Sequence, residues 1–268
     1  MSVRDRPAAA PRLEQPALIL RRFPFGESSL VLHVLTPEVG RVALLAKGAY
    51  RPSSGFFAAF DLFDTLRVRW SARAGQELGL VTRAAIRTRR PAVATELERY
   101  RVGLGLLELA HLTGREGHEE RELFAWLEQG LELLAAAHAA PALVAVAWDL
   151  KLLRANGLAP ALDACASCRA AGEERGGAVP VSAALGGRLC ARCASAARAR
   201  GTSIESLPLN VLRVAASLMV ATPAMLEHTR LQPPLLGRVH AFVARFLEYH
   251  LETRLRTRRA LASTPRHR

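Results

Sequence analysis

The residues best suited to chemistry in this chain are its four cysteines, which stand in two close pairs. Two residues separate Cys165 from Cys168, and Cys190 and Cys193 repeat that spacing further along the chain. This spacing lets one tight turn direct both sulfurs of a pair at the same ion, and thiolates bind Zn²⁺ at about 2.3 Å. Four thiolates complete a tetrahedral shell and leave no position for a substrate. The pattern predicts one structural zinc ion per chain, with metal-free or redox-active cysteines as the alternatives.

The segment between the two cysteine pairs is rich in glycine, which favours a chain reversal that brings the pairs together. Its glycines include Gly176, Gly177, Gly186 and Gly187. Four basic side chains lie around the pairs, namely Arg169, Arg188, Arg192 and Arg198. These arginines could contact phosphate, or they could offset the negative charge of a zinc–tetrathiolate centre. The sequence leaves both interpretations open.

No other set of residues indicates catalysis. Asp61 and Asp64 are the only paired carboxylates in a basic context, and a metal-dependent nuclease would need more ligands. His33 and His111 lie in apolar stretches without an evident nucleophile or carboxylate partner, so we interpret them as packed histidines. Gly103-Leu-Gly105 lies in a helical pattern and lacks the Lys-Ser/Thr of a phosphate-binding loop. The sequence therefore predicts a protein that is not an enzyme.

The second chemical feature is a large excess of positive charge. The chain has 37 basic and 24 acidic residues, a net charge of +13, and arginine supplies nearly all of the basic groups. The net charge is +8 over residues 1–90, −4 over 91–160, +3 over 161–200 and +6 over 201–268. A GC-rich genome would explain the preference for arginine over lysine, but not the basic excess. Positive charge at both ends of the chain predicts a polyanionic partner.

The N-terminal third shows the pattern of a small β-barrel. Turn-forming stretches separate five short apolar runs: Leu18–Leu20, Leu30–Leu35, Val42–Ala46, Leu66–Trp70 and Leu78–Val81. In the fourth run apolar side chains alternate with arginines, as in a strand with one buried face. We expect a flexible segment over residues 1–16 and a five-stranded barrel of the OB type over residues 17–90. An SH3-like barrel would give a similar pattern.

The pattern changes to helical spacing after Pro91. Helices are predicted over Leu97–Leu112, Glu120–Ala137 and Pro141–Asn156, and two more follow the cysteine segment. The chain is therefore expected to be α+β, with a helical domain over residues 91–262 that contains the cysteine segment 163–195.

No targeting or membrane segment is expected. The first residues are charged and rich in Pro and Ala, without the apolar core of a signal peptide. The longest uncharged run, Leu133–Trp148, contains His138 and Pro141 and is typical of a packed helix. We expect a cytoplasmic, nucleoid-associated protein, and a reducing compartment favours a metal over disulfides.

Taken in order, four stretches of the chain resemble the RecO family of bacterial recombination-mediator proteins. They are Ala17-Leu-Ile-Leu-Arg-Arg-Phe-Pro-Phe-Gly26-Glu27-Ser28-Ser29; Leu35-Thr36-Pro-Glu-Val-Gly40-Arg41 with Ala46-Lys47-Gly48-Ala-Tyr-Arg51-Pro-Ser-Ser54; Trp148-Asp-Leu-Lys-Leu-Leu-Arg-Ala-Asn-Gly157-Leu; and the two cysteine pairs. The resemblance covers residues 17–260. It departs near the C-terminus, where His250–Arg256 replaces the Gly and Ser-Arg pair that family members often have.

The resemblance implies an OB barrel joined to a helical domain, with DNA repair as the function. Members of the family bind single- and double-stranded DNA and anneal complementary strands. Together with the RecR ring protein, they help to load RecA recombinase onto strands coated by single-stranded-DNA-binding protein. The alternative is a zinc-ribbon transcription or RNA-binding protein, in which the cysteine pairs themselves contact nucleic acid.

The candidate DNA-binding residues are basic side chains of the barrel: Arg21, Arg22, Arg41, Lys47, Arg51, Arg67 and Arg69. Lys47 and Arg51 are the strongest candidates because they flank Gly48 in a turn and match the basic segment of the family. Phe23 and Tyr50 could stack on bases, although core packing is the simpler explanation for an aromatic residue. The C-terminal series Arg254, Arg256, Arg258 and Arg259 could extend the surface or form a solvated helix end.

Overall fold

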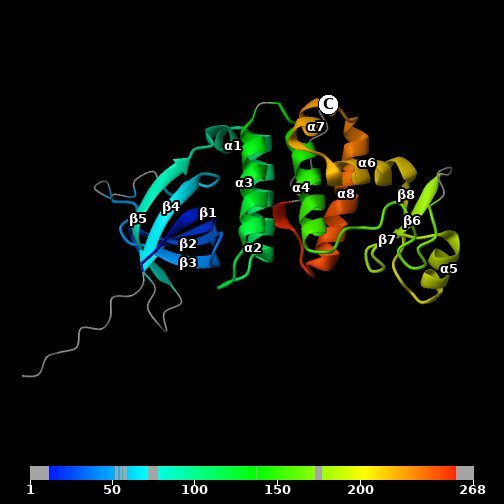
Figure 1. Ribbon diagram of the computed structural model, residues 1–268, viewed down its shortest axis with the longest axis horizontal. Helices are drawn as coiled ribbons and strands as arrows, with labels where there is room; N and C mark the ends of the chain where they lie inside the picture. The colour runs from blue at the N-terminus through cyan, green and yellow to red at the C-terminus, as the bar shows by residue number, and fades with distance from the viewer. Residues whose placement is uncertain are drawn as a thin grey trace, which may run out of the picture. The chain divides into compact units, whose positions relative to one another are not determined.

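A computed structural model describes residues 12–51, 54, 56, 59–71, 78–136, 138–172 and 177–257 (Figure 1). Its strands are β1 (Arg12–Phe25), β2 (Ser29–Thr36), β3 (Gly40–Ala46), β4 (Thr65–Ser71), β5 (Gly79–Thr88), β6 (Ala178–Ser182), β7 (Gly187–Arg188) and β8 (Glu205–Pro208). Its helices are α1 (Pro91–Thr95), α2 (Leu97–Thr113), α3 (Arg121–Ala135), α4 (Pro141–Ala155), α5 (Ala191–Ala199), α6 (Leu209–Val220), α7 (Pro223–His228) and α8 (Pro233–His250). Of the residues singled out above, Gly176, Arg258 and Arg259 lie outside the described part, as do residues 1–11 of the expected flexible segment.

The chain divides into two compact units. The first contains Met1–Thr95 together with Leu107–Leu131, and the second contains Glu96–Leu106 together with Glu132–Arg268. The division differs from the expected boundary after residue 90, because the second half of α2 and most of α3 belong to the compact unit of the barrel. Sequence periodicity locates a helix but does not say which core it packs against.

The five N-terminal strands form a closed barrel in the order β1-β2-β3-β5-β4, and β4 pairs with β1 to close it. β3 and β5 run parallel, whereas the other neighbours are antiparallel. A five-stranded closed barrel of this kind confirms the predicted OB-type fold. β1 begins at Arg12, so residues 12–16 belong to the barrel and not to a flexible segment. They were missed because Pro16 interrupts the apolar pattern, although strand pairing extends through it.

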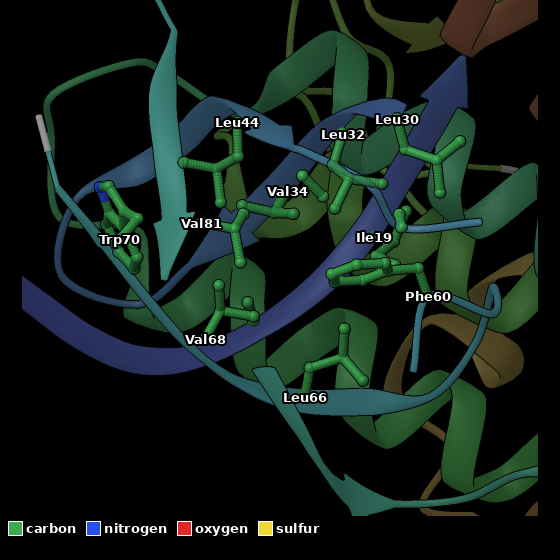
Figure 2. Packing of buried hydrophobic residues seen from close by; sticks show 13 residues of the cluster. Ile19, Leu30, Leu32, Val34, Leu44, Phe60, Leu66, Val68, Trp70 and Val81 are labelled. Atoms are coloured by element: carbon green, nitrogen blue, oxygen red, sulfur yellow. The ribbon is translucent and has the colours of Figure 1, made fainter. Parts of the chain in front are cut away.

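Alternating side chains from the strands fill the barrel interior (Figure 2). Leu32 and Val34 of β2, Leu44 of β3, and Val68 and Trp70 of β4 are almost fully buried. The alternation predicted for Leu66–Trp70 is therefore confirmed, with Arg67 and Arg69 pointing outward. Burial of these branched and aromatic side chains is the main force that holds the barrel together.

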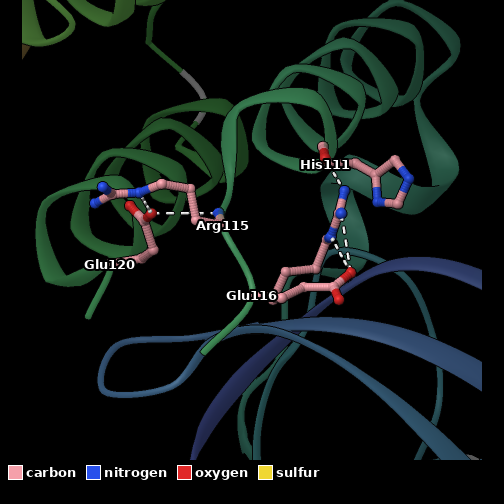
Figure 3. A network of polar contacts seen from close by, with 5 residues as sticks. His111, Arg115, Glu116 and Glu120 are labelled. Atoms are coloured by element: carbon pink, nitrogen blue, oxygen red, sulfur yellow. Dashed lines mark hydrogen bonds and ion pairs between the residues drawn. The ribbon is translucent and has the colours of Figure 1, made fainter. Parts of the chain in front are cut away.

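The turn between β2 and β3 binds the loop that joins α2 to α3. The backbone N–H of Arg41 donates to the carbonyl of Arg115 at 2.8 Å, and that of Glu120 donates to Pro37 at 2.9 Å. The Arg41 guanidinium donates to Glu116 at 2.9 Å and to the carbonyl of His111 at 2.6 Å, while Arg115 pairs with Glu120 (Figure 3). These contacts fix residues 107–131 against the barrel.

A stack of three rings extends this attachment. His33 on β2 lies edge-on to Phe23 of β1, with ring centroids 5.5 Å apart, and stacks on His111 of α2 at 5.4 Å. Burial lowers the pKa of both histidines, and the nearby charges of Arg21 and Arg41 lower it further. Glu116 opposes this shift, yet the pKa of His111 falls to about 4. Both rings are therefore neutral at neutral pH, so they stack without mutual repulsion.

The second unit combines a helical core with a small cysteine-containing sheet. Helices α4, α6 and α8 pack against one another, and every residue of α4 from Leu143 to Leu150 is buried. Strands β6 and β7 of the cysteine segment form a three-stranded antiparallel sheet with β8, which follows that segment, in the order β7-β6-β8; the sequence pattern did not predict this sheet. None of the helices in the described part of the chain has the length and apolar content needed to span a bilayer.

Gly40 offers a test of the contact between the β2–β3 turn and the α2–α3 loop. Its φ is +70°, and a Cβ there would lie 2.2 Å from the carbonyl oxygen of Arg115. Gly117 is the matched control, since its φ is +72° and a Cβ there would meet nothing within 4 Å. Gly117→Ala should lower the free energy of unfolding by about 1–2 kcal/mol, because of the left-handed backbone alone. Gly40→Ala should lower it by about 3 kcal/mol or more, as measured by urea unfolding. Equal losses would contradict this account of the loop contact.

The neutral His33–His111 pair predicts a pH-dependent stability. Between the ordinary pKa of 6.5 and the folded value of about 4, the unfolded chain binds more protons at His111 than the folded chain. The free energy of unfolding should therefore fall as pH drops from 6.5 towards 4. His111→Gln should flatten this slope, as measured by urea unfolding at several pH values. His228→Gln, which removes an exposed histidine from α7, should leave the slope unchanged. An unaltered slope in His111→Gln would show that His111 does not titrate as described.

Candidate metal centre and nucleic-acid interface

The first cysteine pair is shaped by a tight turn in the backbone. The N–H of Arg169 donates to the carbonyl of Cys165 at 2.9 Å, and the N–H of Cys165 donates to Ala170 at 2.9 Å. Arg169 takes a left-handed conformation with φ of 64°, which returns the chain after Cys168. Cys165 is buried and Cys168 is exposed, so the turn places the pair at the edge of a small core.

The second pair lies at the start of α5. Cys190 is the N-cap residue of that helix, and its sulfur accepts a hydrogen bond from the N–H of Cys193 at 3.5 Å. Gly186 and Gly187 turn the chain just before this pair with φ of 84° and 136°. A Cβ on Gly187 would lie 2.4 Å from the carbonyl oxygen of Ala161, so glycine is required there. Hydrogen bonds from Arg188 to Ala161 and from Ala166 to Arg188, both 2.8 Å, then bring the two pairs together.

The four sulfurs form one cluster whose size fits a metal ion. All four ligand atoms lie within 4.8 Å of one another, and the sulfurs of Cys168 and Cys190 are 3.8 Å apart. A tetrahedron with metal–sulfur bonds of about 2.3 Å has edges of about 3.8 Å. Within the described residues, this is the only group of three or more His, Cys, Asp or Glu side chains close enough to share an ion. The predicted cysteine cluster is confirmed, and its donor set suits a thiophilic divalent cation.

Local hydrogen bonds prepare the cluster to bind a cation. Burial raises the pKa of the Cys165 thiol, but N–H groups of Cys168, Cys190 and Ser167 outweigh that effect and lower it to about 6. Side-chain hydrogen bonds with Cys190 and Cys168 raise the pKa of the Cys193 thiol to about 12, because they favour its protonated form, and the charge of Cys165 adds to this effect. A divalent cation would replace that proton and let all four sulfurs be thiolates.

The arginines near the cluster differ in exposure. Arg188 is buried and forms part of the backbone link described above, so it does not offer a phosphate contact. Arg169, Arg192 and Arg198 are exposed, as are Arg254 and Arg256 farther along the chain.

The seven candidate DNA-binding residues of the barrel divide into two groups. Four pair with carboxylates: Arg22 with Asp61, Arg41 with Glu116, and both Arg67 and Arg69 with Glu14. Arg41 is 27% exposed and its guanidinium also holds the carbonyl of His111, so its role is structural. Arg21, Lys47 and Arg51 are exposed, and none of them forms an ion pair with another described residue. The structure brings the predicted residues onto one barrel but leaves only part of them available to a ligand.

Lys47 and Arg51 lie in a turn that is tied to the β1–β2 hairpin. Gly48, with φ of +67°, donates its N–H to the Ser29 hydroxyl at 3.2 Å, and the N–H of Tyr50 donates to the Ser28 carbonyl at 2.9 Å. A further hydrogen bond, from the N–H of Arg51 to the Gly48 carbonyl, closes the turn at 3.0 Å. The basic turn therefore has a defined position beside the hairpin.

Exposed aromatic side chains accompany these cations. Tyr50 is 54% exposed and Phe23 is 42% exposed, so the expectation that they pack in the core was wrong. Phe25, at the end of β1, is 53% exposed and was missed altogether. The sequence contained a signal, because alternation along a strand places Arg21, Phe23 and Phe25 on the same face. That face is the outer one, since β2 pairs them with outward-facing residues.

The paired carboxylates do not form a catalytic site. Asp61 binds the Arg22 guanidinium, whereas Asp64 is buried and accepts a hydrogen bond from the backbone N–H of Arg90 at 2.9 Å. Their interactions stabilise the segment that leads into β4.

Both parts of the chain match models of one protein family. Residues 11–89 match the model described as Recombination protein O N terminal, and residues 94–259 match Recombination protein O C terminal. A DNA repair protein RecO from Anaeromyxobacter sp. strain K is 34% identical over 253 residues, which cover 93% of this chain and 96% of that protein. Proteins with the same name from Streptomyces griseus and Moorella thermoacetica are 30% and 29% identical, over 90% of this chain and 95% and 87% of theirs. With the barrel, the helical region and the cysteine cluster in the expected order, the chain belongs to the RecO family of DNA repair proteins.

Proposed function

We propose that this protein is a recombination mediator that binds single- and double-stranded DNA and anneals complementary strands. The observation that best supports the proposal is the pair of hydrogen-bonded turns that hold Lys47 and Arg51 beside exposed aromatic side chains. Cations without carboxylate partners neutralise phosphates and release counterions, while aromatic rings stack on bases. Lys47, Arg51 and Arg21 are the direct phosphate contacts. Arg22, Arg67 and Arg69 would first have to leave their carboxylate partners.

Annealing needs no chemical step from the protein. Positive charge at both ends of the chain can hold two strands near each other and screen their repulsion, which raises their effective concentration. Base pairing then supplies the free energy. By the family resemblance, the partners would be the RecR ring protein and single-stranded-DNA-binding protein, with RecA loaded indirectly. Such a protein would work at the nucleoid in the cytoplasm and would not be an enzyme.

We propose that the cation of the cysteine cluster is zinc and that its role is structural. Four cysteine ligands leave no open position, so the ion would cross-link the segment around the β7-β6-β8 sheet and take no part in a reaction.

A second candidate function, nucleic-acid binding by the cysteine segment itself, has one observation in its favour. Arg169, Arg192 and Arg198 are exposed around the cluster. Charge reversals in the full-length chain distinguish the two candidates, because each removes the cations of one surface only.

The mediator proposal predicts annealing that depends on the barrel turn. Lys47→Glu/Arg51→Glu should slow the annealing of complementary strands about tenfold or more in a fluorescence-quenching assay without ATP. It should also reduce the slope of log K against log salt by about 1.4 on single strands, because two phosphate contacts are lost at about 0.7 each.

Arg192→Glu/Arg198→Glu is the matched control for this prediction, since it reverses two exposed arginines near the cysteine cluster. This control variant should anneal strands within about twofold of the wild-type rate, and its slope of log K against log salt should equal that of wild type. The opposite result, with the barrel variant unaffected and the control variant impaired, would favour nucleic-acid binding by the cysteine segment.

The metal proposal predicts one zinc per chain in protein purified without added metal, as measured by elemental analysis. Cys165→Ser should lose the zinc and lower the melting temperature, while the DNA affinity of the folded fraction stays near that of wild type. Ser167→Ala, between the first two cysteines but without a ligand atom, should keep both zinc and stability. Less than half an equivalent of zinc together with four titratable thiols would refute the assignment.

A further inference from the structure

Among the described residues, α2 and the α2–α3 loop cover one end of the outer face of β1, β2 and β3. Strand pairing places Arg21, His33 and Ala43 in one row of this face, and Phe23, Val31 and Leu45 in the next. In the first of these rows, the His33 ring stacks on His111 of α2. Beyond it, Leu35 is fully buried and the backbone of Arg41 binds the α2–α3 loop. That end of the face is therefore closed to a ligand.

At the other end of the same face, the described part of the chain exposes aromatic side chains. Phe25 pairs with Ser29 at the last position of the β1–β2 hairpin, and its side chain is 53% exposed. A backbone hydrogen bond from the N–H of Tyr50 to the Ser28 carbonyl ties Tyr50 to that hairpin, and the Tyr50 ring is also exposed. Phe23, one row nearer to α2 on the same strand face, adds a third partly exposed ring, which makes an edge-on contact with His33. We call Phe23, Phe25 and Tyr50 the aromatic platform.

The charge around the aromatic platform favours an anion. Lys47 and Arg51 flank Tyr50, and Arg21 lies next to Phe23 on the same strand face. Glu27, in the hairpin turn, is the one acidic side chain in these two turns. Three exposed cations and one exposed carboxylate leave a local positive excess around large apolar rings. A protein partner would not need this combination, whereas a strand of nucleic acid presents both phosphates and flat bases.

We propose that the aromatic platform stacks unpaired bases and thereby selects single strands, while duplex DNA is held by phosphate contacts alone. This inference rests on the proposed DNA-binding function and assigns its strand selectivity to Phe25 and Tyr50, with Phe23 as the neighbouring ring that contacts His33. In a duplex the base faces are covered by neighbouring pairs, so rings on a protein surface cannot reach them. In a single strand each base has a free face that can stack on an aromatic ring.

The test compares the affinities of wild type and one double variant for two DNA strands, measured by fluorescence anisotropy on the full-length chain. Wild type and Phe25→Ala/Tyr50→Ala are titrated with a labelled single strand and with the same strand containing a run of abasic sites. On the normal strand the double variant should bind at least about tenfold more weakly than wild type. On the abasic strand the two proteins should bind within about twofold of each other, because only the phosphates remain. Duplex affinity should change by less than about twofold.

Two further measurements make the outcome specific. Phe25→Tyr/Tyr50→Phe keeps both rings and should retain wild-type affinity for the single strand. A 2-aminopurine base in the strand should be quenched by wild type and by this conservative variant, but not by Phe25→Ala/Tyr50→Ala. Since all these side chains are exposed, folding is checked by circular dichroism and is expected to be unchanged.

The failures of the two proposals can be told apart. If Lys47→Glu/Arg51→Glu weakens DNA binding but Phe25→Ala/Tyr50→Ala does not, the barrel binds DNA and the stacking inference is wrong. An equal loss on normal and abasic strands would also overturn it, because the rings would then act without bases. If wild type binds neither single strands nor duplex, the proposed function fails and the inference fails with it.

Discussion

The closure of the barrel by β1 is the constraint on which the first unit depends. The first half of β1 pairs with β4 and the second half pairs with β2, the two pairings meet at Leu18, and the register with β2 shifts between Ile19 and Arg21. Because β1 pairs with its two neighbours through different halves of its length, it is longer than the other barrel strands and extends to Phe25. The hairpin that follows stands clear of the core, and its side chains are exposed for this reason. Barrel closure therefore both buries the alternating core and projects the aromatic residues of the hairpin.

Much of this arrangement could be predicted from the sequence, because local patterns determine it. The five apolar runs became the five strands of the barrel, and three predicted helices agree with α2, α3 and α4 to within two residues at either end. The spacing of the cysteines was sufficient to predict their cluster, since a tight turn follows from two intervening residues. In each case the signal lies within a few neighbouring residues, where backbone geometry and side-chain period dominate.

What the sequence could not reveal depends on contacts between distant segments. Nothing near Arg41 indicates that Glu116 and the carbonyl of His111 will occupy its guanidinium, and so the most buried of the candidate arginines was counted among the DNA contacts. The β7-β6-β8 sheet was missed because its strands are only two to five residues long. They are stabilised by the pairing of β6 with β7 and with the later strand β8. Exposure of Phe23 and Tyr50 was misjudged because apolar composition predicts burial only on average.

In the proposed DNA complex, the half-covered face of the barrel would limit the number of nucleotides that the protein contacts. Neighbouring strands of a sheet lie about 4.8 Å apart, so β1, β2 and β3 together span about 10 Å. Stacked nucleotides advance by about 3.4 Å, which leaves room for two or three bases at the open end. Contact with so few bases would be weak enough for the strand to dissociate quickly, and it would leave the pairing edges of the remaining bases accessible. A protein that hands a strand to a complement or to another protein benefits from holding it briefly and at few positions. In the proposed DNA complex, the half of the face that α2 covers would therefore favour rapid release of the strand over tight binding.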